Sequence, residues 1–193
     1  MVDERELIRR ARGGDQKAFE QLVGLKRERA FRLALNIVGD PEEAADIAQM
    51  AFIKLWSSLS KFDENSRFDP WFFRIVVNLA IDAYRKRQRM PHAVTPPADD
   101  ETGALPAASM PGAEAGLMRT EIRVIFNKLA TELAPAQRAV FTLREIEGVP
   151  TDEIAKILGI TVSTVRNHLM HARRILQEGM KRRYPEYFRK GRQ

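Results

Sequence analysis

Residues 151–176 read TDEIAKILGITVSTVRNHLMHARRIL, and this stretch decides the fold of the C-terminal half. Apolar residues recur at helical spacing on both sides of Gly159, which can supply a tight turn. Ala155 is small where two helices must approach closely, and Val165 can lock the second helix onto the first. This pattern predicts a helix, a sharp turn and a second helix, with the spacing of a DNA-binding helix-turn-helix.

The second helix of this motif carries residue types that read DNA. It begins at Thr161 and has no acidic residue along 161–176, which leaves its N-terminal amides free to meet a phosphate. Arginine and asparagine side chains read guanine and adenine edges. The candidate contacts are Ser163, Thr164, Arg166, Asn167, His168, Met170, His171 and Arg174. The alternative is a solvated basic helix in a structural bundle.

Two further features of this half bear on function. A helix is expected to start near Pro135, and it offers Arg138 and Arg144 as candidate phosphate contacts. A metal site at His168 and His171 is not expected, because no third ligand lies nearby and the chain has no Cys.

The N-terminal half shows helix signals and no strand alternation. A helix from Pro41 to about Leu59 has Asp40 as a plausible N-cap and one wide apolar face. Four residues fall opposite that face, namely Asp46, Gln49, Met50 and Ile53. An apolar pair ringed by polar groups suggests a docking surface, although single exposed hydrophobic residues are ordinary.

A helix from about Asp69-Pro70 onward is apolar nearly all round, which indicates burial. Its narrow polar stripe includes Arg74 and Asn78. It ends in a basic cluster at Arg85, Lys86, Arg87 and Arg89. This cluster could contact phosphates, or it could simply complement the helix dipole.

The loop KFDENSRFDP, residues 61–70, precedes this helix. Aromatic and polar groups on such a loop can hold an unstacked base. The candidates are Phe62, Asp63, Asn65, Ser66, Arg67 and Phe68. On their own, the two Phe residues are more often anchors to the core.

Between the halves, residues 91–116 contain no basic and four acidic residues, together with five of the ten prolines. Such composition predicts a flexible acidic linker, and the alternative is an ordered loop packed on a domain. The expected organisation is all-α, with two small helical domains at 1–90 and 117–193 joined by this linker.

Composition narrows the functional classes. The 193 residues carry a net charge of +6, which permits a polyanionic partner. The absence of Cys excludes a disulfide scaffold and a thiol nucleophile. We find no apolar run long enough for membrane insertion, no secretory signal and no catalytic constellation. The chain is therefore expected to be cytoplasmic and not an enzyme, with no cofactor and no small-molecule substrate.

These blocks resemble the bacterial sigma factors of the extracytoplasmic-function (ECF) group. The N-terminal resemblance rests on DPEEAADIAQMAFIKLW and KFDENSRFDPWFFRIVVNLAIDAYRKRQR. The C-terminal resemblance rests on LAPAQRAVFTLREIEGVPTDEIAKILGITVSTVRNHLMHARR. Together they cover about residues 15–90 and 117–183.

The resemblance implies that the chain binds core RNA polymerase and directs it to promoter DNA. It assigns Asp46, Gln49, Met50 and Ile53 to the polymerase contact, and the helix-turn-helix to the −35 element. The −10 element would be read by Phe62, Asp63, Asn65, Ser66, Arg67, Phe68, Arg74, Asn78, Arg85, Lys86 and Arg87. An anti-sigma factor would hold the chain inactive. His168 and His171 stand where the family commonly has Arg, so promoter preference does not carry over.

The competing interpretation is a stand-alone helix-turn-helix regulator with an N-terminal sensor or dimerisation domain. A sensor domain would be expected to show a pocket with strands or a phosphorylatable acidic cluster. The N-terminal half shows instead a buried aromatic helix that ends in Arg and Lys.

Overall fold

The computed structural model describes residues 3–89 and 124–189, and every regular element in these ranges is helical. This confirms the all-α class. The predicted linker at 91–116 lies outside the described residues, so its role stays a prediction. Within the described ranges, no helix is both long enough and apolar enough to cross a membrane.

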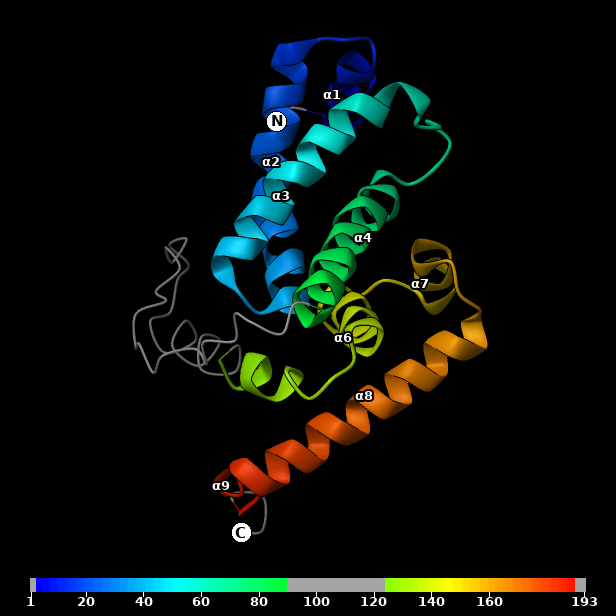
Figure 1. The fold of residues 1–193 in the computed structure, drawn as a ribbon. Helices are drawn as coiled ribbons and strands as arrows, with labels where there is room; N and C mark the ends of the chain where they lie inside the picture. The colour runs from blue at the N-terminus through cyan, green and yellow to red at the C-terminus, as the bar shows by residue number, and fades with distance from the viewer. Residues whose placement is uncertain (1–2, 90–123, 190–193) are drawn as a thin grey trace.

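The N-terminal half is a three-helix bundle with a short helix across one end (Figure 1). The bundle contains α2 (Gln16–Val38), α3 (Pro41–Ser58) and α4 (Phe68–Arg89), and each packs on the other two. The short helix α1 (Glu4–Arg12) packs on α2, and the sequence did not reveal it. A single turn, η1 (Leu59–Lys61), leads from α3 into the loop before α4.

Local side chains fix where these helices begin and end. The carboxylates of Asp15 and Asp40 accept hydrogen bonds from the backbone N–H groups of Ala18 (3.1 Å) and Glu43 (2.8 Å). This confirms Asp40 as an N-cap. Helix α2 ends at Gly39, whose φ of 80° is left-handed and favours glycine.

The C-terminal half contains a helical segment at 124–130, then α6 (Pro135–Phe141), which continues as a π-helical turn, η2 (Thr142–Ile146). Helix α7 (Thr151–Leu158) ends at Gly159, whose φ is 65°, and α8 (Val162–Arg183) follows with Thr161 as N-cap. A short α9 (Glu186–Arg189) closes the described chain. The predicted helix-turn-helix is confirmed.

The two halves pack against each other. Helices α6 and α7 contact α4, and α6 also contacts α2 (Figure 1). Val140, Leu143 and Ile154 belong to the same buried apolar cluster as Leu33 and Val76. A smaller second cluster joins residues 125–133 to the middle of α8. A continuous core therefore crosses the boundary between the two predicted domains.

Candidate functional site

Helix α3 presents the predicted polar-apolar surface to solvent. Its core face is buried through Ala44, Ile47, Ala48, Ala51 and Leu55. Opposite that face, Asp46 and Gln49 are exposed, and Met50 and Ile53 expose 45% and 55% of their surface. These four residues, which we call the α3 face, are available to a partner.

The loop before α4 is held in one conformation by Asp63. Its carboxylate accepts hydrogen bonds from the backbone N–H and side-chain amide of Asn65 and from the Ser66 hydroxyl, at 3.0–3.2 Å. The backbone N–H of Asn65 is the main cause that lowers the pKa of Asp63. Asp63, Asn65, Ser66 and Arg67 are all exposed. The loop thus offers a preorganised polar edge.

A hollow of about 530 Å³ lies between this loop and the start of α1. Phe62 and Phe68 border it but are only 3% and 7% exposed, and their rings pack edge to face at 5.5 Å. Their contact with a base stays a prediction, because in this structure the two rings pack in the core. They are core anchors. The α1 wall, formed by residues that include Arg5 and Arg9, was missed by the sequence reading.

The polar stripe of α4 is exposed as predicted at Arg74 and Asn78, and Arg85 and Lys86 of the basic cluster are exposed as well. Arg87 is also exposed, but its guanidinium donates to Glu43 (2.9 Å) and to the carbonyl of Val38 (3.0 Å). Any role of Arg87 at DNA must therefore compete with this intramolecular contact.

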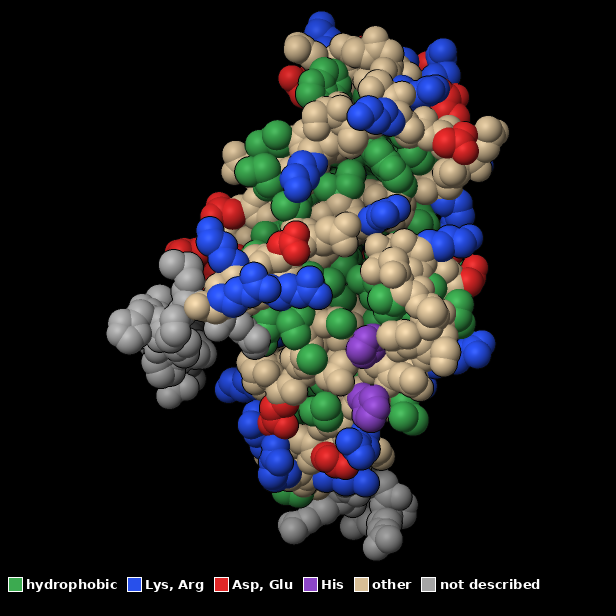
Figure 2. Space-filling model, turned by 45° about the vertical axis from the view of Figure 1, so that its right-hand side comes forward, with side chains coloured by type: hydrophobic (Ala, Val, Ile, Leu, Met, Phe, Trp, Pro, Cys, Tyr) green, Lys and Arg blue, Asp and Glu red, His purple; other side chains and the backbone are tan. Residues whose placement is uncertain are grey.

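Most of the predicted DNA-contacting residues of helix α8 are exposed to solvent. Ser163, Arg166, Asn167, Met170 and Arg174 are exposed, and Thr164, His168 and His171 are half-buried. One N-terminal amide is already used, because the Thr161 hydroxyl accepts from Thr164 N–H at 3.1 Å. Figure 2 shows histidine and basic side chains close together on the lower half of the molecule. Among the described residues, no cluster of three or more His, Asp or Glu could hold a metal ion.

The two arginines predicted near α6 have different environments. Arg144 is exposed and donates to the carbonyl of Val149 at 3.2 Å. Arg138 is only 1% exposed, and its Nε donates to the carbonyl of Asn36 at 2.5 Å. The assignment of Arg138 to DNA stays a prediction; in this structure its guanidinium lies against the C-terminal end of α2.

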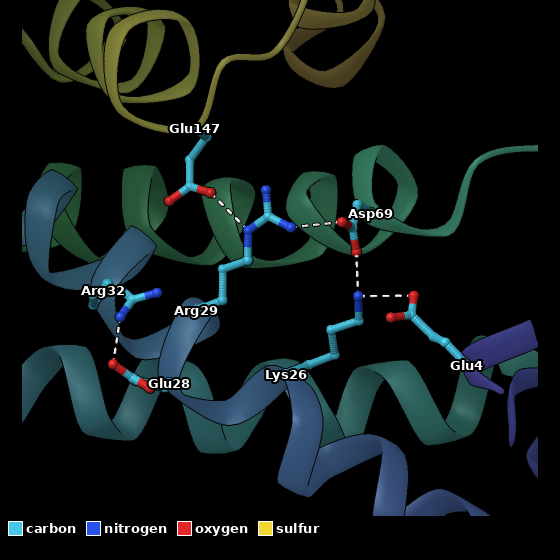
Figure 3. A network of polar contacts seen from close by, with 7 residues as sticks. All are labelled: Glu4, Lys26, Glu28, Arg29, Arg32, Asp69 and Glu147. Carbon is cyan, nitrogen blue, oxygen red and sulfur yellow. Dashed lines mark hydrogen bonds and ion pairs between the residues drawn. The ribbon is translucent and has the colours of Figure 1, made fainter. Parts of the chain in front are cut away.

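A chain of ion pairs joins both halves (Figure 3). Lys26, whose side chain is 8% exposed, contacts Glu4 at 2.8 Å and Asp69 at 2.6 Å. Arg29 contacts Asp69 at 2.6 Å and Glu147 at 2.7 Å. Burial would lower the pKa of Arg29, but the hydrogen bond to Glu147 and the two carboxylate charges raise it overall. No local sequence signal links residues this far apart, so sequence reading could not find the network.

Each half of the chain matches a known protein family. Residues 22–90 match Sigma-70 region 2, and residues 123–176 match Sigma-70, region 4. The RNA polymerase sigma-H factor of Pseudomonas aeruginosa is 31% identical over 180 residues, which cover 92% of this chain and 93% of that protein. The ECF RNA polymerase sigma-E factor of Escherichia coli is 33% identical over 172 residues, which cover 86% and 88%.

Solved structures show the same fold. CnrH, solved in complex with the cytosolic domain of CnrY, matches with a TM-score of 0.67 at 25% identity, over 94% of this chain and 99% of that one. The sigma factor RpoE of Bartonella quintana, solved with the anti-sigma factor NepR, matches with a TM-score of 0.65 at 24% identity, over 86% and 98%.

The α3 face, the loop before α4 and the helix-turn-helix all lie within the two matched regions. The matches cover nearly the whole length of curated sigma factors, which favours this interpretation over a stand-alone regulator. The chain belongs to the ECF group of the sigma-70 family of RNA polymerase sigma factors.

Proposed function

We propose that this sigma factor docks on core RNA polymerase through the α3 face. The observation that carries this proposal is the exposure of Met50 and Ile53 between Asp46 and Gln49 on a helix whose other face is fully engaged in the core. Exposed apolar side chains with a polar rim are the usual anatomy of a binding surface.

Promoter reading is divided between the two halves in this proposal. The −10 element meets the polar edge at Asp63, Asn65, Ser66 and Arg67, together with the α4 stripe. The donors and acceptors of this edge suit an unpaired strand, and the basic end of α4 suits duplex phosphates. Arg166 and Asn167 of α8 read −35 base edges, and Arg144 and Arg174 contact phosphates.

The chain acts in this proposal as a binding subunit in the cytoplasm, and the polymerase supplies all bond-forming chemistry. We also propose an anti-sigma factor as a partner. The fold likeness to CnrH, which was solved with the cytosolic domain of CnrY, supports a protein partner of that kind.

The test is co-elution of the chain with core RNA polymerase in size-exclusion chromatography. The Met50→Asp/Ile53→Asp variant is expected to lose co-elution and keep its helical content, because both residues are exposed. Met170→Asp is the matched control, since Met170 is also exposed (59%) but lies on the proposed −35 surface. It is expected to co-elute normally and to lose promoter selectivity. Equal behaviour of the two variants at the polymerase step would refute the α3 face as the docking surface.

A further inference from the structure

Met170 of α8 is an exposed apolar side chain on a helix face that is otherwise polar or basic. It exposes 59% of its surface, more than any other large hydrophobic residue in the part of the chain that the structure describes. It belongs to neither of the two apolar clusters that form the core there. The opposite side of α8 is fixed by Val165 and Leu169, which are buried. The Met170 side chain therefore points away from the core.

The neighbours of Met170 on α8 are residues proposed to contact DNA. Asn167 lies three positions before it, and Arg166 and Arg174 lie four positions to either side. Helical residues at these spacings have Cβ atoms about 5–6 Å apart. All three neighbours are exposed, and their side chains make no hydrogen bond or ion pair within the described ranges. Met170 thus lies in the middle of a surface whose polar groups are free to meet a partner.

The major groove of DNA offers one group that suits an apolar side chain. The base edges present hydrogen-bond donors and acceptors there, and thymine adds its C5-methyl group, which apolar side chains contact. Methionine is unbranched and flexible, so its end can follow the position of that methyl group. Arg and Asn are the side chains that read guanine and adenine. A Met between them therefore matches a thymine close to those bases.

We propose that Met170 reads the C5-methyl group of a thymine in the −35 element. The thymine lies within about two base pairs of the base read by Arg166 or Asn167, because a Cβ separation of about 5–6 Å compares with a rise of about 3.4 Å per base pair. The inference rests on the proposed function, in which α8 reads the −35 element, and it adds the base and the chemical group that Met170 recognises. The contact removes both apolar groups from water, so it discriminates thymine from the same base without its methyl group.

Exposure by itself would not distinguish Met170 from other surface residues. Leu25 of α2 is 56% exposed, and single exposed hydrophobic residues are common in proteins. Arg29, one helical turn after Leu25, is already held by two ion pairs. Met170 differs from Leu25 because the base-reading side chains around it are unpaired.

The test is a uracil scan of the −35 element, because deoxyuridine pairs as thymidine does and lacks only the C5-methyl group. Holoenzyme is reconstituted from the full chain and core RNA polymerase, and −35 elements are selected from duplexes with a randomised upstream segment. Each thymine of the selected element is then replaced in turn by deoxyuridine, and the dissociation constant is measured at one salt concentration. At one thymine, wild-type holoenzyme is expected to bind the methylated base about fourfold more tightly, the ratio that corresponds to about 0.8 kcal/mol for a buried methyl-sized group.

Two variants connect this preference to the side chain. Met170→Ala removes the flexible end of the side chain and is expected to abolish the preference for thymine over uracil at that position. Leu25→Ala is the matched control, because it shortens a similarly exposed side chain in the other half of the chain, and it is expected to keep the wild-type preference. Each value compares two DNA duplexes with the same protein, so a general loss of affinity in a variant cancels.

Two results would overturn the proposal. One is a selected −35 element in which no uracil replacement weakens binding by wild-type holoenzyme. The other is a preference for thymine that persists unchanged in Met170→Ala. In both cases, selection of a −35 element by the holoenzyme still supports the proposed function. A holoenzyme that selects no sequence would instead refute the reading of a −35 element by α8, and the methyl contact with it.

Discussion

Among residues 3–89 and 124–189, two cations are buried, and their surroundings are opposite. Lys26, inside the N-terminal half, contacts the carboxylates of Glu4 and Asp69. Arg138, between the halves, donates to the Asn36 carbonyl and, at 3.5 Å, to the side-chain oxygen of Asn127. Lys26 joins α1, α2 and α4 within the N-terminal half, whereas Arg138 joins α6 to the C-terminal end of α2 across the boundary between the halves. A buried cation that is paired with carboxylates recovers more of its desolvation cost than one that meets only neutral oxygens.

The largest expected effect is at Lys26. Lys26→Met leaves Glu4 and Asp69 without their shared cation, although both are partly exposed and Asp69 keeps Arg29. Removing one partner of a fully buried pair costs about 3–5 kcal/mol, so we expect a loss of about 2 kcal/mol in the free energy of unfolding. Urea unfolding followed by tryptophan fluorescence measures it, because Trp56 and Trp71 both lie in the N-terminal half.

Arg32→Met is the control for this measurement. Arg32 lies on the same helix and pairs with Glu28, but both side chains are well exposed (Figure 3). An exposed i,i+4 pair contributes about 0.3–0.5 kcal/mol. A Lys26 variant no less stable than the Arg32 variant would show that the buried network does not hold α1 to the bundle.

Several features of the structure could be predicted from local sequence patterns alone. The cap at Asp40, the turn at Gly159 and the outward position of Met50 and Ile53 follow from local spacing, and the structure confirms them. The helix expected to begin at Thr161 begins at Val162, with Thr161 as its N-cap. These features depend on residues within one or two helical turns of each other.

Arg138 could not be placed in this way. On sequence it is a basic residue near a DNA-binding motif, and its partner, the Asn36 carbonyl, lies 102 positions earlier. The sequence left open whether Phe62 and Phe68 face a base or the core for a related reason, because a loop aromatic points outward or inward according to the core beneath it. Helix α1 has local signals that could have predicted it, namely the Asp3 cap and apolar residues at Leu7, Ile8 and Ala11.

A smaller effect is expected at Gly39, the residue that makes room for Arg138. Gly39→Ala places a side chain at φ 80°, which costs about 1–2 kcal/mol, and its Cβ meets the guanidinium at 3.1–3.2 Å. Gly159→Ala is the control, since Gly159 caps a helix with φ 65° and has nothing within 4 Å of the added Cβ. We expect chemical denaturation to show a greater loss of stability for Gly39→Ala than for Gly159→Ala.

The double variant Gly39→Ala/Arg138→Met tests the contact between residue 39 and the Arg138 guanidinium. One cause of a greater loss of stability in Gly39→Ala than in Gly159→Ala would be that its Cβ meets the Arg138 guanidinium. In that case the effects of Gly39→Ala and Arg138→Met on the free energy of unfolding are expected to be non-additive, because the more flexible Met can move away from the new Cβ. Additive losses would assign the whole effect to backbone strain. The Arg138 guanidinium would then have room to move away from a side chain at position 39.

The smallest expected effect concerns Asp63, a polar anchor that depends on neither buried cation. Its hydrogen bonds, chiefly that from Asn65 N–H, hold its pKa below the ordinary value of 3.8. A lowered pKa in the folded state means that the bonds stabilise the loop above about pH 4, and that this contribution disappears as pH falls through the lowered pKa. The protection factor of the Asn65 amide, which corrects for the intrinsic pH dependence of exchange, is expected to fall over that acidic range in the wild type and not in Asp63→Asn. If the same fall in protection persisted in Asp63→Asn, the Asp63 carboxylate would not be its cause.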